Sequence, residues 1–274
     1  MTRLQLPHRV IEYAGRQIVQ VPEQHLVAHA ADMVARWRAG ALDLPQNSVL
    51  EKNNNLPSGK GNFWREARRF PATIILIALS ILGYGVIAFE PLQALAPMFT
   101  FYPLRLAPGG IVLLPLAEGL AAGQWWRLVS PAFLHFGVFH IVFNSLWLWE
   151  LGRRVEFVYG FTRYLLFFFI AAIASNLGQH FWNDTAGIFG GMSGVVYALV
   201  GYIGVRQRLA PHPALMVPPA ILAFMVGWLI LCLTGVVDVF MAGGIANGAH
   251  VGGLVAGALA GLIHWRPRAH QGRN

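Results

Sequence analysis

The sequence predicts an all-α protein that crosses a membrane several times. Of its 274 residues, 56% are hydrophobic and only 12% are charged, about half the charged fraction of a typical soluble domain. Apolar runs close to the roughly 20 residues needed to cross a bilayer recur along the chain. We therefore expect a polytopic helical bundle, preceded by a small and more polar N-terminal region.

Residues 1–62 make up this N-terminal region. A weak apolar alternation around Ala14-Gly15 predicts a short β-hairpin. So small a unit buries little core, and we expect a cytosolic accessory region that either pairs with a second copy, giving a homo-oligomer, or lies on the membrane. Its polar end, 46–62, is typical of a linker. The apolar spacing beyond Pro22 predicts an amphipathic helix with one face formed by Leu26, Ala30, Met33, Val34 and Trp37.

Residues 63–274 make up the second predicted domain, in which six apolar segments alternate with short connections. Arginine or lysine lies before the first segment, between the second and third, and after the fourth and sixth. The connections 183–187 and 235–244 contain neither. The positive-inside rule then predicts that both termini are cytoplasmic, so the second, fourth and sixth segments enter from the outer side. The six segments are about 71–91, 131–151, 163–182, 188–205, 214–234 and 247–265.

The net charge and the long outer loop both indicate that the partner of this protein is a membrane. The net charge of +8 is explained by arginines beside the spans, so we expect the lipid bilayer and no nucleic acid as a partner. The loop 92–130 is apolar and ends in a Trp125-Trp126-Arg127 sequence suited to the membrane interface. Arg127 either caps helix ends or holds a lipid phosphate, or it is a snorkelling surface arginine. The single cysteine, Cys232, excludes a disulfide framework.

Four polar residues share one depth in the outer half of the predicted bundle. Ser193 lies about a turn and a half into the fourth segment, and His250 lies about one turn into the sixth. His140 and Asn144 share a face of the second segment. Polar groups at membrane depth are costly and normally face the bundle interior for a functional reason. Small residues that allow helices four and six to approach closely are Gly190, Gly194, Gly253, Gly257 and Gly261.

This set of residue types points to nucleophilic acyl transfer. A serine within about 3 Å of an imidazole is activated by it, so we expect Ser193 as nucleophile and His250 as general base. The outer acidic residues lie in connections, which favours a dyad over a triad. Asn144, His140 and the Ser193 backbone N–H are the expected oxyanion donors. A zinc site made of His135, His140 and His250 is an alternative, but the absence of cysteine or a well-placed carboxylate argues against it, and we expect neither metal nor cofactor.

Three stretches resemble the rhomboid intramembrane serine proteases, in particular the bacterial GlpG-type members: "HFGVFHIVFNSLWLWELGRRVE", "GGMSGVVYALVGY" and "ANGAHVGGLVAG". The resemblance covers about 71–265. It implies a six-helix rhomboid bundle in the bacterial inner membrane that cleaves transmembrane proteins near their outer membrane boundary. It implies the same dyad and oxyanion donors, with supporting positions at Gly191 and at Tyr197, which would pack against the histidine. The interfacial-loop motif would be Trp126-Arg127, and Phe143 would lie near a substrate gate.

Two other functions compete with an active protease. One is a proteolytically inactive relative that binds membrane helices for quality control; loss of the serine or histidine would mark it, and both are present. The other is a small transporter with polar groups at the midplane. A transporter would continue its polar residues along the inner halves of the helices, which here are apolar or rich in glycine. The natural substrate is not encoded in any pattern of this chain.

Overall fold

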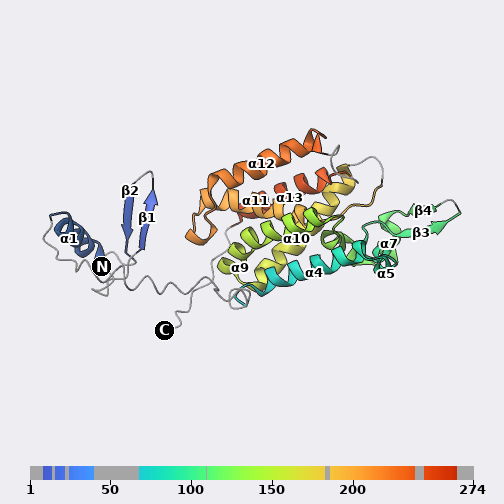
Figure 1. Ribbon diagram of the computed structural model, residues 1–274, viewed down its shortest axis with the longest axis horizontal. Helices are drawn as coiled ribbons and strands as arrows, with labels where there is room; N and C mark the ends of the chain where they lie inside the picture. The colour runs from blue at the N-terminus through green and yellow to red at the C-terminus, as the bar shows by residue number, and fades with distance from the viewer. Residues whose placement is uncertain are drawn as a thin grey trace. The chain divides into compact units, whose positions relative to one another are not determined.

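The computed structural model describes residues 9–13, 16–21, 25–39, 68–108, 110–182, 186–237 and 244–263. The chain divides into two compact units, residues 1–61 and 62–274. The predicted linker 46–62 lies outside the described residues. Figure 1 shows the helices and strands of each unit.

The N-terminal unit contains the hairpin and the helix expected from the sequence. Strand β1 (Arg9–Tyr13) pairs antiparallel with β2 (Arg16–Gln20), with Tyr13 opposite Arg16. Helix α1 (Leu26–Arg38) buries Ala30 and Met33. Trp37, which we expected on the apolar face, is 58% exposed. The buried part of that face is therefore shorter than the periodicity suggests.

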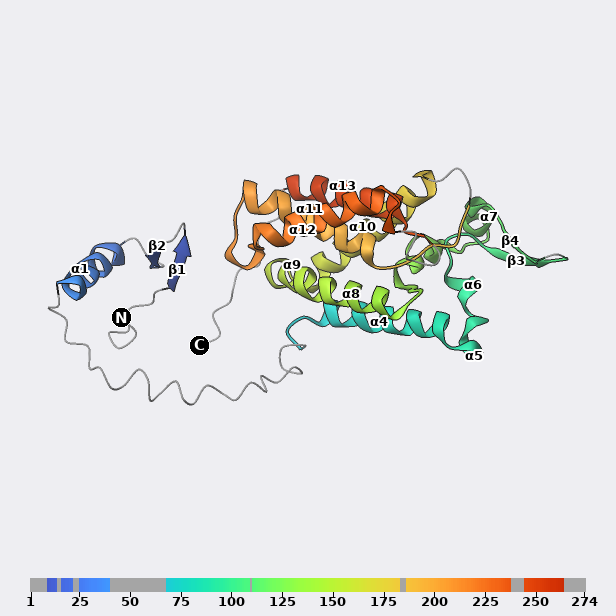
Figure 2. The same ribbon diagram turned by 45° about the horizontal axis from the view of Figure 1, so that its top comes forward.

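Six helical rods build the described part of the second unit. Figures 1 and 2 show them roughly side by side, with the elements of loop 90–133 gathered at one end. Two of the described helices, α4 and α10, are long and apolar enough to cross a bilayer, and α12 is apolar but shorter. The rods are α4 (Pro71–Ala88), α8 (Val138–Trp147) continued by a π-helical turn (Leu148–Gly152) and α9 (Arg153–Tyr159), α10 (Phe161–Trp182), α11 (Ser193–Leu209), α12 (Pro219–Leu233) and α13 (Asn247–Leu262).

Three of the predicted helix starts were placed too early. The fifth rod begins at Pro219 rather than at residue 214. Residues 130–133 form a 3₁₀ turn rather than the first turn of the second rod, which begins at Val138 and continues to Tyr159. The fourth rod begins at Ser193 rather than at residue 188. Gly191 has a φ of 119°, a backbone conformation that side chains disfavour. The chain therefore turns sharply at the glycines, and Ser193 is the first residue of α11.

Helix α11 is the centre of the bundle, because every residue from Gly194 to Ile203 is buried. Helix α13 crosses it through glycines. A Cβ placed on Gly253 would overlap the Gly194 backbone, and one placed on Gly257 would overlap the Ala198 backbone. The two helices thus meet backbone to backbone, as the glycine spacing predicts.

A buried carboxylate joins α9 to the start of α4. Glu156 is 3% exposed and accepts hydrogen bonds from the backbone N–H groups of Ala72 and Thr73, both at 2.8 Å, and from the Thr73 hydroxyl at 2.7 Å. The first N–H groups of a helix have no partner within the helix, and negative charge is favourable there. Glu156 therefore caps α4 from another element.

Loop 90–133 is a structured layer rather than a plain connection. A hairpin of β3 (Leu104–Ala107) and β4 (Gly110–Leu113), which no sequence pattern led us to expect, projects from it (Figure 2). The turn Trp125–Leu128 then brings the chain back to the bundle. The other helices of the loop are α5 (Glu90–Gln93), α6 (Ala96–Phe99) and α7 (Leu116–Ala121).

Candidate active site

Ser193 and His250 meet where α11 and α13 cross. The Ser193 Oγ lies 2.7 Å from the His250 Nε2. His250 is the fourth residue of α13 and is 7% exposed. The close approach depends on the neighbouring glycines, since a Cβ on Gly194 would overlap the Ser175 side chain and lie 3.1 Å from the Ala249 carbonyl oxygen.

Tyr197 supports the histidine from one turn further along α11. Its ring centroid lies 4.8 Å from that of His250, and its hydroxyl donates to the Met225 carbonyl at 3.1 Å. The other ring nitrogen of His250, Nδ1, is buried and has no hydrogen-bond partner in the described part of the chain. The acidic residues of the outer connections, Asp184 and Asp238, lie outside the described residues.

His140 and Asn144 line the other side of the turn that leads into Ser193. Both project from α8 toward Gly191. A Cβ on Gly191 would lie 2.5 Å from the His140 Nε2 and 3.7 Å from the Asn144 Nδ2. Asn144 is 6% exposed. The structure thus brings two side-chain nitrogens to the backbone immediately before the serine, and only a glycine leaves room for them.

His135 fixes the same turn, a role that sequence reasoning missed. It is fully buried, its Nδ1 lies 2.9 Å from the Phe133 carbonyl oxygen, and the Met192 N–H donates to its Nε2 at 3.4 Å. The Gly191 N–H donates to the Pro131 carbonyl at 3.0 Å. Because both ring nitrogens of His135 are used within the protein, it is not available as a metal ligand. Among the described residues, no group of three His, Cys, Asp or Glu side chains is arranged to hold a metal ion.

Arg127 organises the outer loop internally, in a way that agrees with the helix-capping role raised by the sequence and not with the other two roles. It is 5% exposed. Its Nη1 donates to the carbonyls of Pro97 and Thr100 at 2.9 and 2.7 Å, and its Nε donates to the Gln124 Oε1 at 2.6 Å. Burial lowers the pKa of Arg127, yet an arginine stays protonated in proteins. Arg127 therefore caps the C-terminal end of α6, and its burial argues against a snorkelling or lipid-bound side chain. Trp126 beside it is 48% exposed and donates to the Met98 carbonyl at 2.8 Å.

An aromatic cluster connects this loop to the irregular segment before Ser193. The Tyr102 hydroxyl lies 2.8 Å from the His180 Nδ1, and the Phe101 ring contacts the rings of His180 and Phe189 at 5.6 and 5.3 Å. Burial raises the pKa of Tyr102, which keeps its hydroxyl protonated and able to donate. The loop thereby holds the segment 186–191 in place.

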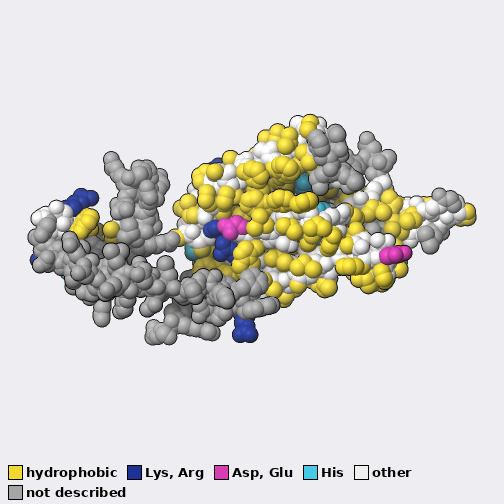
Figure 3. Space-filling model, in the orientation of Figure 1, with side chains coloured by type: hydrophobic (Ala, Val, Ile, Leu, Met, Phe, Trp, Pro, Cys, Tyr) yellow, Lys and Arg dark blue, Asp and Glu magenta, His cyan; other side chains and the backbone are white. Residues whose placement is uncertain are grey.

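The surface and the site together define the class of protein. Figure 3 shows a face covered mainly by hydrophobic side chains and broken by a small charged cluster, and the bundle encloses a serine hydrogen-bonded to a histidine. A nucleophile within reach of a base is the arrangement of serine hydrolases, and here it lies between helices rather than on a soluble scaffold.

Comparison with known proteins identifies the family. Residues 122–267 match the family model of the rhomboid domain. The chain is 43% identical over 240 residues to Rhomboid protease GlpG of Yersinia pestis (strain Pestoides F) and of Yersinia pseudotuberculosis serotype O:3 (strain YPIII), covering 85% of this chain and 73% of each relative. The chain is also 42% identical over 147 residues to Rhomboid protease GlpG of Serratia proteamaculans (strain 568), and this match covers 54% of this chain and 51% of the relative. The chain belongs to the rhomboid family of intramembrane serine proteases and is of the GlpG type. It is accordingly an all-α membrane protein.

Proposed function

We infer that this rhomboid protease hydrolyses peptide bonds of transmembrane proteins with a Ser193–His250 dyad. The observation that carries the proposal is the 2.7 Å contact between the Ser193 Oγ and the His250 Nε2. At this distance the hydroxyl can donate to a neutral imidazole, which is the ground state that general-base catalysis requires.

The dyad acts in two half-reactions. His250 Nε2 takes the Ser193 hydroxyl proton as the Oγ attacks the scissile carbonyl carbon. The tetrahedral intermediate collapses, and the leaving amine receives that proton from His250. Water, deprotonated by His250, then attacks the acyl-enzyme ester and releases the second product, with the proton returned to Ser193. No carboxylate is required in this scheme, which agrees with the unpartnered Nδ1 of His250 among the described residues.

The oxyanion of each intermediate is stabilised by donors around Gly191. We assign this role to the Asn144 amide, the His140 imidazole and the Ser193 backbone N–H. Support comes from the approach of the His140 Nε2 and the Asn144 Nδ2 to Gly191, two residues before the nucleophile. Donors fixed before the reaction need no reorganisation as charge develops, which is why they contribute strongly to rate.

The proposed orientation puts the site near the outer surface of a bacterial inner membrane. We propose that the six rods span the bilayer and that both termini are cytoplasmic. The distribution of arginine supports this: Arg206 and Arg208 lie in the last turn of α11, at the opposite end of that helix from Ser193. Water would then reach the dyad from the outer side, and substrates would be cut near their outer boundary.

Cleavage by the purified protein in liposomes tests the proposal. A labelled single-span substrate is incubated with wild type, Ser193→Ala, His250→Ala and the control Ser145→Ala, which changes a half-buried hydroxyl elsewhere on α8. We expect cleavage by wild type and Ser145→Ala, and none by either dyad variant. Full cleavage by Ser193→Ala would exclude Ser193 as the nucleophile.

A further inference from the structure

Arg206, in the last turn of α11, is a buried arginine whose Nε has no acceptor in the described part of the chain. The residue is 4% exposed, and its Nε is fully buried without a hydrogen-bond partner. The ion pairs between described residues use the carboxylates of Asp32 and Glu150, and none of them involves Arg206. An arginine stays protonated in proteins, and a buried charge without a partner is costly. Arg206 therefore requires an acceptor that these residues do not supply.

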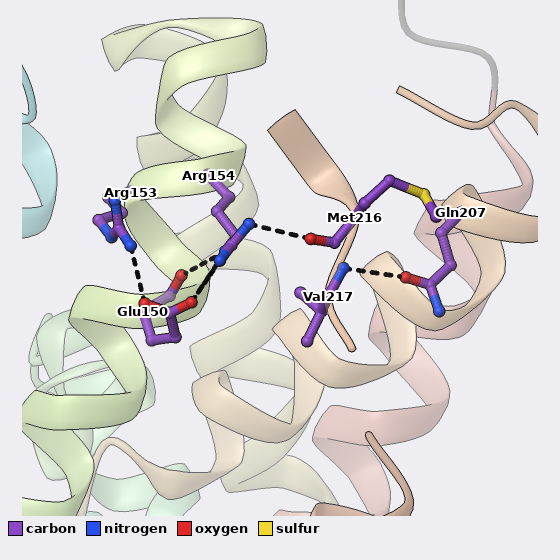
Figure 4. Close-up of polar contacts among 6 residues, drawn as sticks. All are labelled: Glu150, Arg153, Arg154, Gln207, Met216 and Val217. Atoms are coloured by element: carbon purple, nitrogen blue, oxygen red, sulfur yellow. Dashed lines mark hydrogen bonds and ion pairs between the residues drawn. The ribbon is translucent and has the colours of Figure 1, made fainter. Parts of the chain in front are cut away.

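Neighbouring side chains at this end of the bundle already have partners. Arg154 on α9 is half-buried and pairs with the Glu150 carboxylate (Figure 4). Gln207, the residue after Arg206, accepts from the Val217 N–H through its Oε1 at 3.3 Å (Figure 4). A half-buried arginine is thus held here by an oxygen acceptor, and Arg206 departs from that pattern.

A favourable position at the end of a helix does not explain the burial of Arg206. Arg208 lies in the same last turn, is exposed, and donates through Nη1 to the Gly204 carbonyl at 2.9 Å. It takes the usual role of a basic residue at a helix C-terminus, which is to bond a terminal carbonyl. Arg208 is therefore the matched comparison for Arg206, with the same charge in the same turn but without the burial.

The location of Arg206 indicates the kind of acceptor. It lies about 20 Å beyond Ser193 along α11, which under the proposed orientation is near the inner boundary of a hydrocarbon core about 30 Å thick. One turn earlier, the Tyr202 ring contacts the rings of Tyr159 and Phe167 at 6.0 and 5.2 Å. Because aromatic packing fills the side toward the core, a ligand reaches the guanidinium from the inner end of the bundle.

We propose that Arg206 binds a phosphate group at the inner end of the bundle. A guanidinium presents its donors in a planar fork that matches two phosphate oxygens. Lipid headgroups offer such phosphates at this depth, and anionic lipids are enriched on the cytoplasmic side. A phospholipid and free inorganic phosphate share this chemistry. The site rests on the proposed orientation of the rods and is independent of the proposed catalysis.

The effect of one substitution with and without lipid tests the site. Wild type, Arg206→Met and the control Arg208→Met are freed of lipid in a neutral detergent, and their unfolding temperatures are measured. Without phosphate, we expect Arg206→Met to unfold at the wild-type temperature or above it, because an unpaired buried charge is removed. A saturating short-chain phosphatidylglycerol should then raise the unfolding temperature of wild type and Arg208→Met by about 5 °C. Arg206→Met should show no such gain.

Two further additions distinguish the source of the phosphate. Diacylglycerol with the same acyl chains lacks the phosphate and should leave wild type unchanged. A gain with phosphatidylglycerol alone assigns the site to a lipid headgroup, and a gain with inorganic phosphate assigns it to the free anion as well. Titration should give a dissociation constant about tenfold higher for Arg206→Lys, which keeps the charge but lacks the planar fork.

Four results would overturn the proposal. The first is the absence of a gain in wild type with either source of phosphate, and the second is an equal gain in Arg206→Met. The third is an equal gain with diacylglycerol, since the acyl chains would then be responsible. The fourth is a lower stability of Arg206→Met than of wild type without phosphate, or a failure of that variant to fold, because the guanidinium would then have its acceptor within the protein. None of these results depends on cleavage, so they leave the dyad proposal to its own test.

Discussion

At the residue scale, Asn144 is the side chain whose role is most easily separated from folding. It is buried on α8, and its Nδ2 lies close to the Gly191 turn. We expect Asn144→Ala to lower kcat by about two to three orders of magnitude with KM little changed, because an oxyanion donor acts in the transition state. Steady-state kinetics on a single-span substrate measure this. A loss confined to KM would show that Asn144 binds substrate instead.

Glu156 gives a second prediction at this scale, for stability. It accepts three hydrogen bonds at the start of α4. In Glu156→Gln an NH₂ group replaces one acceptor oxygen and faces backbone donors, so we expect a loss of about 2–3 kcal/mol in the free energy of unfolding. Thermal or denaturant unfolding in detergent measures it, with Glu118→Gln on the exposed side of α7 as the control. Equal stability of the two variants would contradict the capping role.

The roles of single residues were only partly predictable from the sequence. The sequence predicts a shared depth for Ser193, His250, His140 and Asn144. The structure brings Ser193 to His250, and it brings His140 and Asn144 to Gly191. Arg127 bonds to backbone carbonyls about thirty residues earlier in the chain. Because every residue has a backbone carbonyl, the order of side chains does not indicate which carbonyls Arg127 bonds. The partners of Arg127 could therefore not be predicted from the sequence. The same holds for His135, whose Nε2 accepts from a backbone N–H.

At the element scale, the crossing of α11 and α13 depends on glycine. We expect Gly257→Ala to lower the free energy of unfolding by about 2 kcal/mol through overpacking, although alanine favours a helix. A Cβ there would overlap the Ala198 backbone, whereas one at Gly227 on α12 would meet no atom within 4 Å.

Gly227→Ala is therefore the matched control, and it should be neutral or stabilise the protein by up to about 1 kcal/mol. Unfolding of both variants in the same detergent makes the comparison. If the two substitutions had the same effect, close backbone packing would not be what holds α11 against α13.

Element boundaries were the weakest part of the sequence reading. Apolar composition continues through residues 131–137 and 188–192, so hydropathy alone extends both helices too far. The actual starts are set by the 3₁₀ turn at Ser130–Phe133 and by the positive φ of Gly191. The hairpin β3–β4 was missed because its strands are only four residues each and lie in a uniformly apolar loop.

At the scale of the whole molecule, the proposed orientation in the membrane rests on where the arginines lie. In a Cys232→Ala background, Ile188→Cys adds a thiol before α11, and Arg208→Cys adds one in its last turn; both positions are exposed. We expect a membrane-impermeant maleimide to label Ile188→Cys in intact bacterial spheroplasts. Arg208→Cys should react only after the membrane is permeabilised. Labelling in the reverse order would invert the proposed topology and put the dyad near the cytoplasmic surface.

The number of rods was predictable because bilayer thickness sets the length of apolar segment to look for in the sequence. Once the segments were counted, each polar residue could be assigned to its rod. The relation of the rods to one another was predictable only for α11 and α13, where glycines recur at helical spacing. The attachment of α12 was not, since it depends on the Met216, Met225 and Cys232 carbonyls. Its side chains are almost uniformly apolar and give no sign of these contacts.

The central claim is that His250 activates Ser193 within the bundle. Mass spectrometry of the intact protein after exposure to a fluorophosphonate tests it most directly. In the wild-type protein we expect one adduct per chain, on Ser193. In His250→Ala we expect the reagent to modify the protein at least a hundredfold more slowly. The unfolding temperature of His250→Ala shows whether this variant is folded. Equal rates in wild type and a folded His250→Ala, or an adduct on another residue, would contradict the dyad.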